Sequence, residues 1–143
     1  MATSISADSH SQASPAAVFD LLVRGQTWPS WSPIDSAEVD DPSGRQQVGD
    51  KRIFHTGRAV SVEPVTELIP DRLFRYEIEP GKFFRSYQGT VRLAAAPQGG
   101  TQISWSAVFE PALPLSGFFW RLVLTRFMRR MADGLAEYAA QGH

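Results

Sequence analysis

A histidine in the middle of the chain is the first candidate for proton-transfer chemistry. His55 is the only histidine away from the two ends, and an imidazole that titrates near neutral pH would suit the removal of a proton next to a carbonyl. Its neighbour Phe54 belongs to a segment that alternates like a strand, in which adjacent residues point to opposite faces. If Phe54 points inward, His55 points to solvent, and we therefore expect His55 to lie outside the site.

Charged residues on neighbouring predicted strands are the next candidates. Glu63, Glu67, Arg75 and Glu77 lie mostly on the parity opposite to the aromatic residues, which indicates a solvated cross-strand charge ladder. The apolar spacing slips around Pro64, however, and a bulge or an edge position there is expected. If a bulge reverses the parity, either glutamate enters the interior, where a buried carboxylate is a candidate acid or base.

Three aromatic side chains and one arginine could contact a ligand. Tyr76, Tyr87 and Trp105 could donate hydrogen bonds to a ligand carbonyl or hydroxyl, or they could form a close-packed aromatic core without a cavity. Arg52 shares the parity of Phe54. It is expected either to reach a carboxylate or phosphate on a ligand or to lie at the end of its strand.

Composition excludes several classes of function. The chain has no cysteine, and its three histidines show no ligand-like spacing, so neither a disulfide nor a metal site is expected. There is no Ser/His/Asp arrangement, and the glycine pair at 99–100 indicates a hairpin rather than a nucleotide loop, so no cofactor is expected. The net charge of −1 argues against a nucleic-acid partner.

The length and the first residues suggest a single domain in the cytoplasm. A chain of 143 residues fits one domain over 1–143. The segment Met1–Gln12 is polar and lacks the apolar region of a secretory signal. No stretch of about twenty apolar residues exists that would span a membrane as a helix. We therefore expect a cytoplasmic protein without a transmembrane segment.

Punctuation by proline and glycine divides the chain into one strand, two short helices, six strands and a long helix. The first strand is expected within Thr3–Gln12. Ser14 is a helix cap with Pro15 at the first helical position, and a short turn follows over Thr27–Pro33. Alternating apolar residues between turns predict six further strands, which short connections make antiparallel: Ser36–Asp40, Gly49–Thr56, Arg58–Leu68, Leu73–Ile78, Ser86–Ala95 and Thr101–Glu110.

The segment Leu115–Gln141 predicts a long amphipathic helix. It is the only element long enough to cover the apolar face of the sheet, and a strongly twisted sheet curls around the helix that it holds. The fold class is therefore α+β, a helix-grip fold of about seven strands with two short helices after the first strand. A gap between sheet and helix would form an apolar pocket. The expected ligand-binding residues are Trp31, Phe54, Tyr76, Tyr87, Trp105, Phe109, Trp120, Leu124, Phe127 and Met131.

The order of several motifs resembles a known family. The motifs are ASPAAVFDLL at 13–22, WPSWSP at 28–33, VGD at 48–50, VTELIPDRL at 65–73 and GGTQISW at 99–105. Together they resemble the START/Bet v 1-like (SRPBCC) superfamily, in particular its polyketide cyclase/dehydrase and lipid transport branch. The resemblance covers nearly the whole chain and implies the helix-grip fold. It also implies that Trp28 and Trp31 wall the pocket mouth; the alternative is that they pack the short helices onto the sheet.

Three functions remain open from the sequence. The leading one is a carrier for a hydrophobic metabolite such as a lipid, an isoprenoid or a polyketide-like compound. The second is a cyclase or dehydratase that works without a metal in the same cavity, where a tyrosine or carboxylate would move a proton. The third is an interaction module with a filled core. The question of whether the chain is an enzyme stays open here.

A second apolar patch near the start of the long helix should be partly exposed. It consists of Leu115, Phe118, Phe119 and Leu122, and such patches mark a partner, a membrane or a pocket entrance. The family resemblance favours an entrance. The neighbouring Arg121 and Arg126 could meet lipid phosphates in a transient membrane contact, and a homodimer contact fits the same residues.

Overall fold

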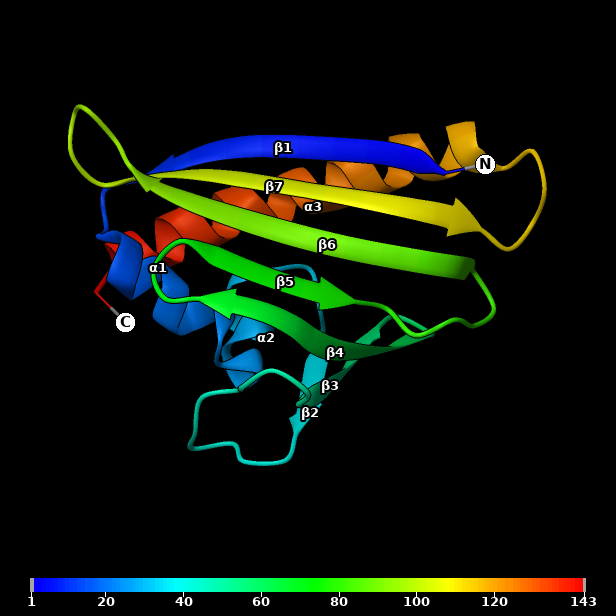
Figure 1. The fold of residues 1–143 in the computed structure, drawn as a ribbon, viewed down its shortest axis with the longest axis horizontal. Helices are drawn as coiled ribbons and strands as arrows, with labels where there is room; N and C mark the ends of the chain where they lie inside the picture. Colours follow the sequence, from blue (N-terminus) through cyan, green and yellow to red (C-terminus); the bar gives the residue numbers. More distant parts are fainter. Residues whose placement is uncertain (1, 143) are drawn as a thin grey trace.

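Seven antiparallel strands form one curved sheet in the computed structural model, which describes residues 2–142. The strand order is β1-β7-β6-β5-β4-β3-β2, so the first strand forms one edge of the sheet and pairs with the last strand, β7 (Figure 1). The observed elements match the order expected from the sequence. The strands are β1 (Thr3–Ser11), β2 (Ser36–Val39), β3 (Lys51–Thr56), β4 (Ala59–Ile69), β5 (Leu73–Glu77), β6 (Phe84–Ala95) and β7 (Thr101–Pro111).

Two helices and a 3-10 turn follow the first strand, and one long helix ends the chain. They are α1 (Pro15–Leu22), the turn Gly25–Thr27, α2 (Trp28–Trp31) and α3 (Gly117–Ala140). The predicted cap of α1 is confirmed, because the Ser14 hydroxyl accepts a hydrogen bond of 3.2 Å from the Ala17 amide.

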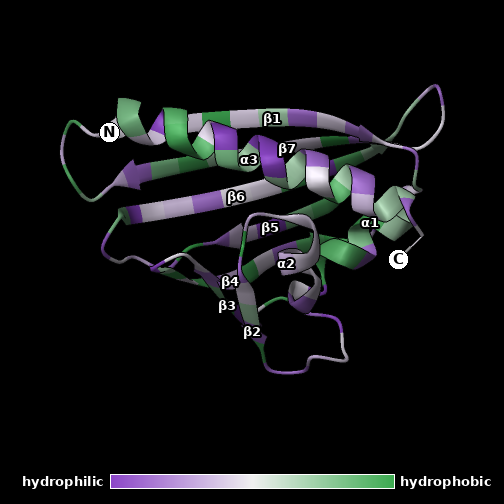
Figure 2. Ribbon diagram, turned by 180° about the vertical axis from the view of Figure 1, so that it is seen from behind, coloured by the Kyte–Doolittle hydropathy of each residue, from purple (hydrophilic) through white to green (hydrophobic). Residues whose placement is uncertain are grey.

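The long helix crosses the concave face of the sheet over β1 and β7 (Figures 1 and 2). This arrangement confirms the helix-grip fold. The second half of α3 is closely packed, and its buried residues are Met128, Met131, Ala132, Leu135, Ala136 and Ala139. In the first half, Trp120, Leu124 and Phe127 of the predicted stripe are only partly buried. The helix therefore holds the sheet tightly at its end and loosely at its beginning.

A bulge in β4 decides which residues of that strand face inward. The pairing of β4 with β5 shifts between Val65 and Glu67, so the extra residue is Thr66 rather than a residue at Pro64. Before the bulge the odd-numbered residues face the interior: Glu63 and Val65 are buried, whereas Val60 is 58% exposed. The expected charge ladder is confirmed for Glu67 and Arg75, which form an ion pair. It was wrong for Glu63, which lies inside.

Candidate functional site

A cavity of about 230 Å³ lies between the curved sheet and the first half of α3. Its wall is mostly apolar and aromatic, and its polar members include Ser61, Glu63, Tyr76 and Tyr87. Larger depressions elsewhere on the described surface lie away from these groups. The structure brings seven of the ten expected ligand-binding residues together around the cavity: Phe54, Tyr76, Tyr87, Trp120, Leu124, Phe127 and Met131.

The other three expected residues lie behind the cavity wall. Trp31, Trp105 and Phe109 are buried and are not among the lining residues. Trp28 takes the place expected for Trp31, because α2 is a single turn that directs Trp28 toward Phe54, with ring centroids 5.2 Å apart. Trp105 packs edge-on against Trp28 at 5.5 Å. The role of these residues in ligand binding stays a prediction.

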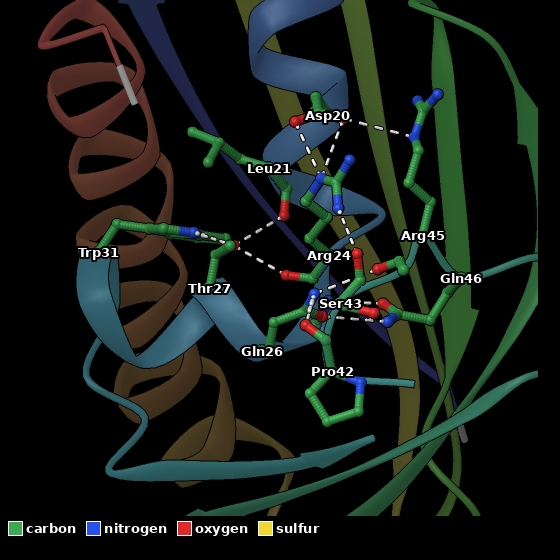
Figure 3. A network of polar contacts seen from close by, with 12 residues as sticks. Asp20, Leu21, Arg24, Gln26, Thr27, Trp31, Pro42, Ser43, Arg45 and Gln46 are labelled. Carbon is green, nitrogen blue, oxygen red and sulfur yellow. Dashed lines mark hydrogen bonds and ion pairs between the residues drawn. The ribbon is translucent and has the colours of Figure 1, made fainter. Parts of the chain in front are cut away.

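Hydrogen bonds hold the connection between α1 and α2, and Figure 3 shows those of Thr27, Trp31 and Gln46. The side-chain oxygen of Gln46 accepts a hydrogen bond from the backbone amide of Gly25. The backbone amide of Gln46 donates to the Val23 carbonyl at 2.6 Å. The Trp31 indole donates to the Thr27 hydroxyl at 3.1 Å, and the Trp28 indole donates to a carbonyl at the end of α1, also at 3.1 Å. The loop before β3 therefore holds the connection at Val23 and Gly25, and each indole is held by a hydrogen bond within residues 22–31.

A buried ion pair lies at the inner end of the cavity. The Arg52 guanidinium Nη2 is 3.4 Å from Glu63 Oε1, and Arg52 Nε donates to the Glu63 carbonyl at 3.2 Å. The other carboxylate oxygen, Oε2, accepts a hydrogen bond of 2.8 Å from the Ser61 hydroxyl. Glu63 lines the cavity, whereas Arg52 is fully buried behind it. Burial raises the pKa of the Glu63 carboxyl. The Arg52 guanidinium, which stays charged, and the Ser61 hydroxyl both donate to its oxygens; they oppose this rise and stabilise the carboxylate form.

Aromatic rings surround the guanidinium of Arg52. The centroids of Trp28, Phe54, Phe74 and Tyr76 lie 4.7, 5.0, 5.0 and 5.6 Å from its central carbon. Ring faces attract a desolvated cation, which compensates in part for Arg52 Nη1, a buried nitrogen without a hydrogen-bond partner. Burial lowers the pKa of Arg52, but a guanidinium stays charged in proteins. The positive charge is thus held by π faces on one side and by Glu63 on the other.

From the sequence, an inward Glu63 is one of two alternatives, and the register of the β3–β4 hairpin decides between them. The two residues at 57–58 connect the strands, and Gly57 has a φ of 59°. This connection pairs Phe54 with Ser61 and Arg52 with Glu63. Directly paired residues share one face of a sheet, so the inward direction of Phe54 carries Glu63 into the interior as well.

Two tyrosines supply protonated hydroxyls to the cavity. Tyr76 Oη accepts a hydrogen bond of 3.1 Å from the Trp105 indole. Burial raises the pKa of Tyr76 far above its ordinary value and also raises that of Tyr87, which the Tyr76 hydroxyl raises further. Room for the Tyr76 ring comes from Gly89 on the neighbouring strand, because a Cβ there would lie within 2.6 Å of ring atoms and the hydroxyl. Both phenols are therefore neutral hydrogen-bonding groups at physiological pH.

His55 lies outside the cavity, as expected. Its imidazole contacts the Glu38 carboxylate at 2.6 Å on the outer side of the β2–β3 pair. The predicted second patch is also exposed: the exposed fractions are 76% for Phe118, 58% for Phe119 and 61% for Leu122, and Leu115 is fully exposed.

The arrangement combines an apolar cavity, one carboxylate and two neutral phenols. Such a cavity can bind a small apolar molecule, and its polar groups can orient that molecule or exchange a proton with it. The carboxylate can accept a hydrogen bond or a proton, and the phenols can donate a hydrogen bond to a carbonyl oxygen.

Comparison with known proteins agrees with the fold. A START superfamily protein from Mycobacterium smegmatis has a TM-score of 0.81 at 15% identity, with 96% of this chain and 97% of that chain covered. Ara h 8.0201 has a TM-score of 0.74 at 18% identity, covering 99% and 100% of the two chains. The protein XoxI from Bacillus cereus has a TM-score of 0.74 at 19% identity, covering 99% of each.

These structural likenesses concern the fold. Among curated proteins, none matches the sequence. The family model described as "Polyketide cyclase / dehydrase and lipid transport" matches residues 2–140. The chain therefore belongs to the polyketide cyclase/dehydrase and lipid transport family, and it shares its helix-grip fold with START and Bet v 1-like proteins.

Proposed function

We propose that this protein binds a compact hydrophobic small molecule in the cavity under the first half of α3. The observation that carries the proposal is the cavity itself, whose wall combines apolar side chains with a few polar groups. Leu124 and Phe127 form its roof and Phe54 part of its floor. This composition is the usual one for a small-molecule site.

The size of the cavity favours a small ligand over a long lipid chain. Its volume of about 230 Å³ is below the range of roughly 300–1,000 Å³ for pockets that hold drug-sized molecules. A single or fused aromatic ring system or a short isoprenoid suits this space. Apolar burial supplies most of the affinity, so binding in the micromolar range is expected.

An enzymatic function in the same cavity is the second candidate, because Glu63 and the tyrosines supply the groups that a cyclase or dehydratase needs. Removal of a proton next to a ligand carbonyl requires a base, and Glu63 is a carboxylate at the cavity wall. The developing oxyanion requires a donor, and Tyr87 keeps its proton because burial raises its pKa. No metal is needed for this step.

The exposed apolar patch supports contact with an anionic membrane surface during ligand uptake. Residues 112–132 contain Arg121, Arg126, Arg129 and Arg130 and no acidic residue. Exposed apolar side chains next to arginines are typical of helices that lie at a lipid interface. Leu115 has a φ of 66° and points fully into solvent, which is unusual for a bulky residue. None of the helices within residues 2–142 has the length and apolar character to span a membrane.

Native mass spectrometry of the freshly purified protein tests the binding function. We expect a stoichiometric apolar adduct that is released on denaturation and can be identified after organic extraction. A Leu124→Trp variant, which fills the cavity, should lose the adduct. Thr125→Trp, one residue further and outside the cavity lining, is the matched control and should keep it.

A clean mass for the wild type counts against the proposal if it persists after incubation with a panel of small aromatic compounds, isoprenoids and lipids. A mass that increases with protein concentration would assign the exposed patch to a homodimer instead of a membrane. The cytoplasmic location expected from the sequence stays a prediction.

A further inference from the structure

The polar groups of the cavity differ in what they still have to offer a ligand. The Ser61 hydroxyl already donates a hydrogen bond to Glu63, and the Tyr76 oxygen already accepts one from Trp105. The carboxylate of Glu63 has about four acceptor positions, and within the described chain only Ser61 and Arg52 donate to it. The Arg52 contact is long, at 3.4 Å. Glu63 therefore keeps acceptor capacity at the cavity wall.

Unused acceptor capacity of this kind is costly in an apolar cavity. A buried carboxylate without its full set of hydrogen bonds loses solvation free energy that only a donor restores. The Glu63 side chain is 8% exposed, so bulk water supplies little of this. A ligand that brings a hydroxyl or an amine fills the vacant acceptor position, whereas a pure hydrocarbon leaves it unfilled.

The charges of the pair are also placed unequally with respect to the ligand. Glu63 is part of the cavity lining, but Arg52 lies behind it, enclosed by aromatic rings. A ligand therefore meets the negative partner at contact distance and the positive partner through other side chains. A carboxylate on the ligand would face a like charge in a medium that screens it poorly.

A structural role alone gives little reason for this pair. A buried ion pair is weak evidence for stability, because apolar residues of similar volume often replace it without loss. Arg52 keeps one unpaired nitrogen, Nη1, even with Glu63 present. Burial of the pair therefore costs the desolvation of two charges. The position of Glu63 at the cavity wall offers a functional reason for the presence of this pair.

We infer that Glu63 determines the chemical class of the ligand: it accepts a hydrogen bond from a hydroxyl or amine on an otherwise apolar molecule, and it disfavours ligands that carry a carboxylate. This inference rests on the proposed binding function. It excludes free fatty acids as the preferred ligands and favours alcohols, phenols and amines of compact apolar skeleton.

Three probes of one skeleton test the inference by equilibrium dialysis at pH 7: naphthalene, 2-naphthol and 2-naphthoate. We expect the wild type to bind 2-naphthol about tenfold more tightly than naphthalene, since one hydrogen bond to a charged acceptor is added. It should bind 2-naphthoate more weakly than naphthalene.

The variant Glu63→Gln should change the affinities for 2-naphthol and 2-naphthoate in opposite directions. The preference for 2-naphthol over naphthalene should fall to about threefold or less, because a neutral acceptor is weaker. Binding of 2-naphthoate should improve, because Arg52 loses its counter-charge. A purely structural role of Glu63 would weaken all three probes alike. Glu67→Gln, on the same strand but in the outer ion pair with Arg75, should leave the order unchanged.

A second variant keeps the buried ion pair intact. Ser61→Ala removes the hydroxyl that occupies Glu63 Oε2, so the preference for 2-naphthol should be kept or increased. Loss of the preference in Ser61→Ala would assign ligand recognition to Ser61 and overturn the inference.

The outcomes separate the inference from the proposed function. If the wild type binds naphthalene but binds 2-naphthoate as tightly as 2-naphthol, the cavity binds ligands and the inference about Glu63 is wrong. If the wild type binds none of the probes, the proposed function fails and the inference fails with it.

Discussion

Arg52 and Glu63 are paired directly across the β3–β4 hairpin, and their side chains meet inside the sheet with Nη2 and Oε1 3.4 Å apart. The exposed fractions are 0% for the Arg52 side chain and 8% for that of Glu63. Each charge is thus compensated mainly by the other. The effects of the two residues on stability are therefore not independent, because removal of one partner leaves the other as an uncompensated buried charge.

Removal of one partner should therefore destabilise the protein more than removal of both. We expect Glu63→Leu to lower the free energy of unfolding by about 3 kcal/mol, because it leaves a buried charge without its partner. The double variant Arg52→Met/Glu63→Leu should return to within about 1 kcal/mol of the wild type. Unfolding in denaturant measures both.

The exposed ion pair on the same sheet provides the control. Glu67→Leu removes the partner of Arg75 at a position that is 45% exposed, and it should cost less than about 1 kcal/mol. Additive losses in the double variant of Arg52 and Glu63 would mean that the two residues act independently.

A glycine in α3 should resist replacement by a better helix former. Alanine normally stabilises a helix interior by about 1 kcal/mol relative to glycine. A Cβ at Gly134, however, would lie 1.8 Å from the carbonyl oxygen of Trp31, where α3 crosses α2. We therefore expect Gly134→Ala to destabilise the protein by about 2 kcal/mol, measured by thermal or denaturant unfolding.

The exposed position Glu137 in the same helix is the comparison. Glu137→Ala should change the free energy of unfolding by no more than about 0.5 kcal/mol. A Gly134→Ala variant as stable as the wild type would mean that the two helices can separate at this contact.

The two cavity tyrosines should make the protein less stable in alkali. Burial raises the pKa of Tyr76 and Tyr87 in the folded state, so the unfolded chain releases these protons first. Their contribution to stability is complete below the unfolded pKa near 10 and is lost as pH rises toward the folded pKa values. Each tyrosine should lower the free energy of unfolding by about 1.4 kcal/mol per pH unit in that window.

Denaturant unfolding over a pH series, combined with tyrosinate absorbance, measures this dependence. The variant Tyr76→Phe/Tyr87→Phe should show a flatter decline above about pH 10. Ionisation of more than one of the three tyrosines near that pH, with native circular dichroism retained, would refute the expected protection.

Vesicle binding should depend on the exposed patch. We expect the wild type to bind vesicles that contain anionic lipids and to release them as salt is added, because Arg121 and Arg126 lie beside the apolar residues. The variant Phe118→Ser/Leu122→Ser should reduce binding by more than tenfold, since two exposed apolar side chains are removed. Co-sedimentation with the vesicles measures the effect.

Two exposed valines on the outer face of the sheet provide a matched control for lost apolar surface. Val60 and Val108 are 58% and 50% exposed, and their replacement by serine should leave vesicle binding unchanged. Equal binding by the patch variant and the wild type would show that the patch does not contact lipid. A dimer that disappears in the patch variant would assign the patch to self-association.

The sequence by itself determined the elements and their arrangement, because these depend on local signals. Alternating residues such as Phe74 and Tyr76 predict a strand, the cap at Ser14 marks a helix, and short turns require antiparallel pairing. The apolar face of the long helix then indicates the helix-grip fold, because no other element is long enough to cover the sheet. Motifs in the expected order added the family, which the match over residues 2–140 confirmed.

Only the tertiary structure decided the chemistry of the cavity wall. A single bulge at Thr66 changes the face of every residue on one side of it, and the turn at Gly57 sets which residues of β3 and β4 are opposite each other. These choices brought Glu63 inward, and a single helical turn placed Trp28 rather than Trp31 at the cavity. A local pattern shows that residues alternate between the two faces of a strand, but not which set faces inward. Pairing with other segments of the chain decides that.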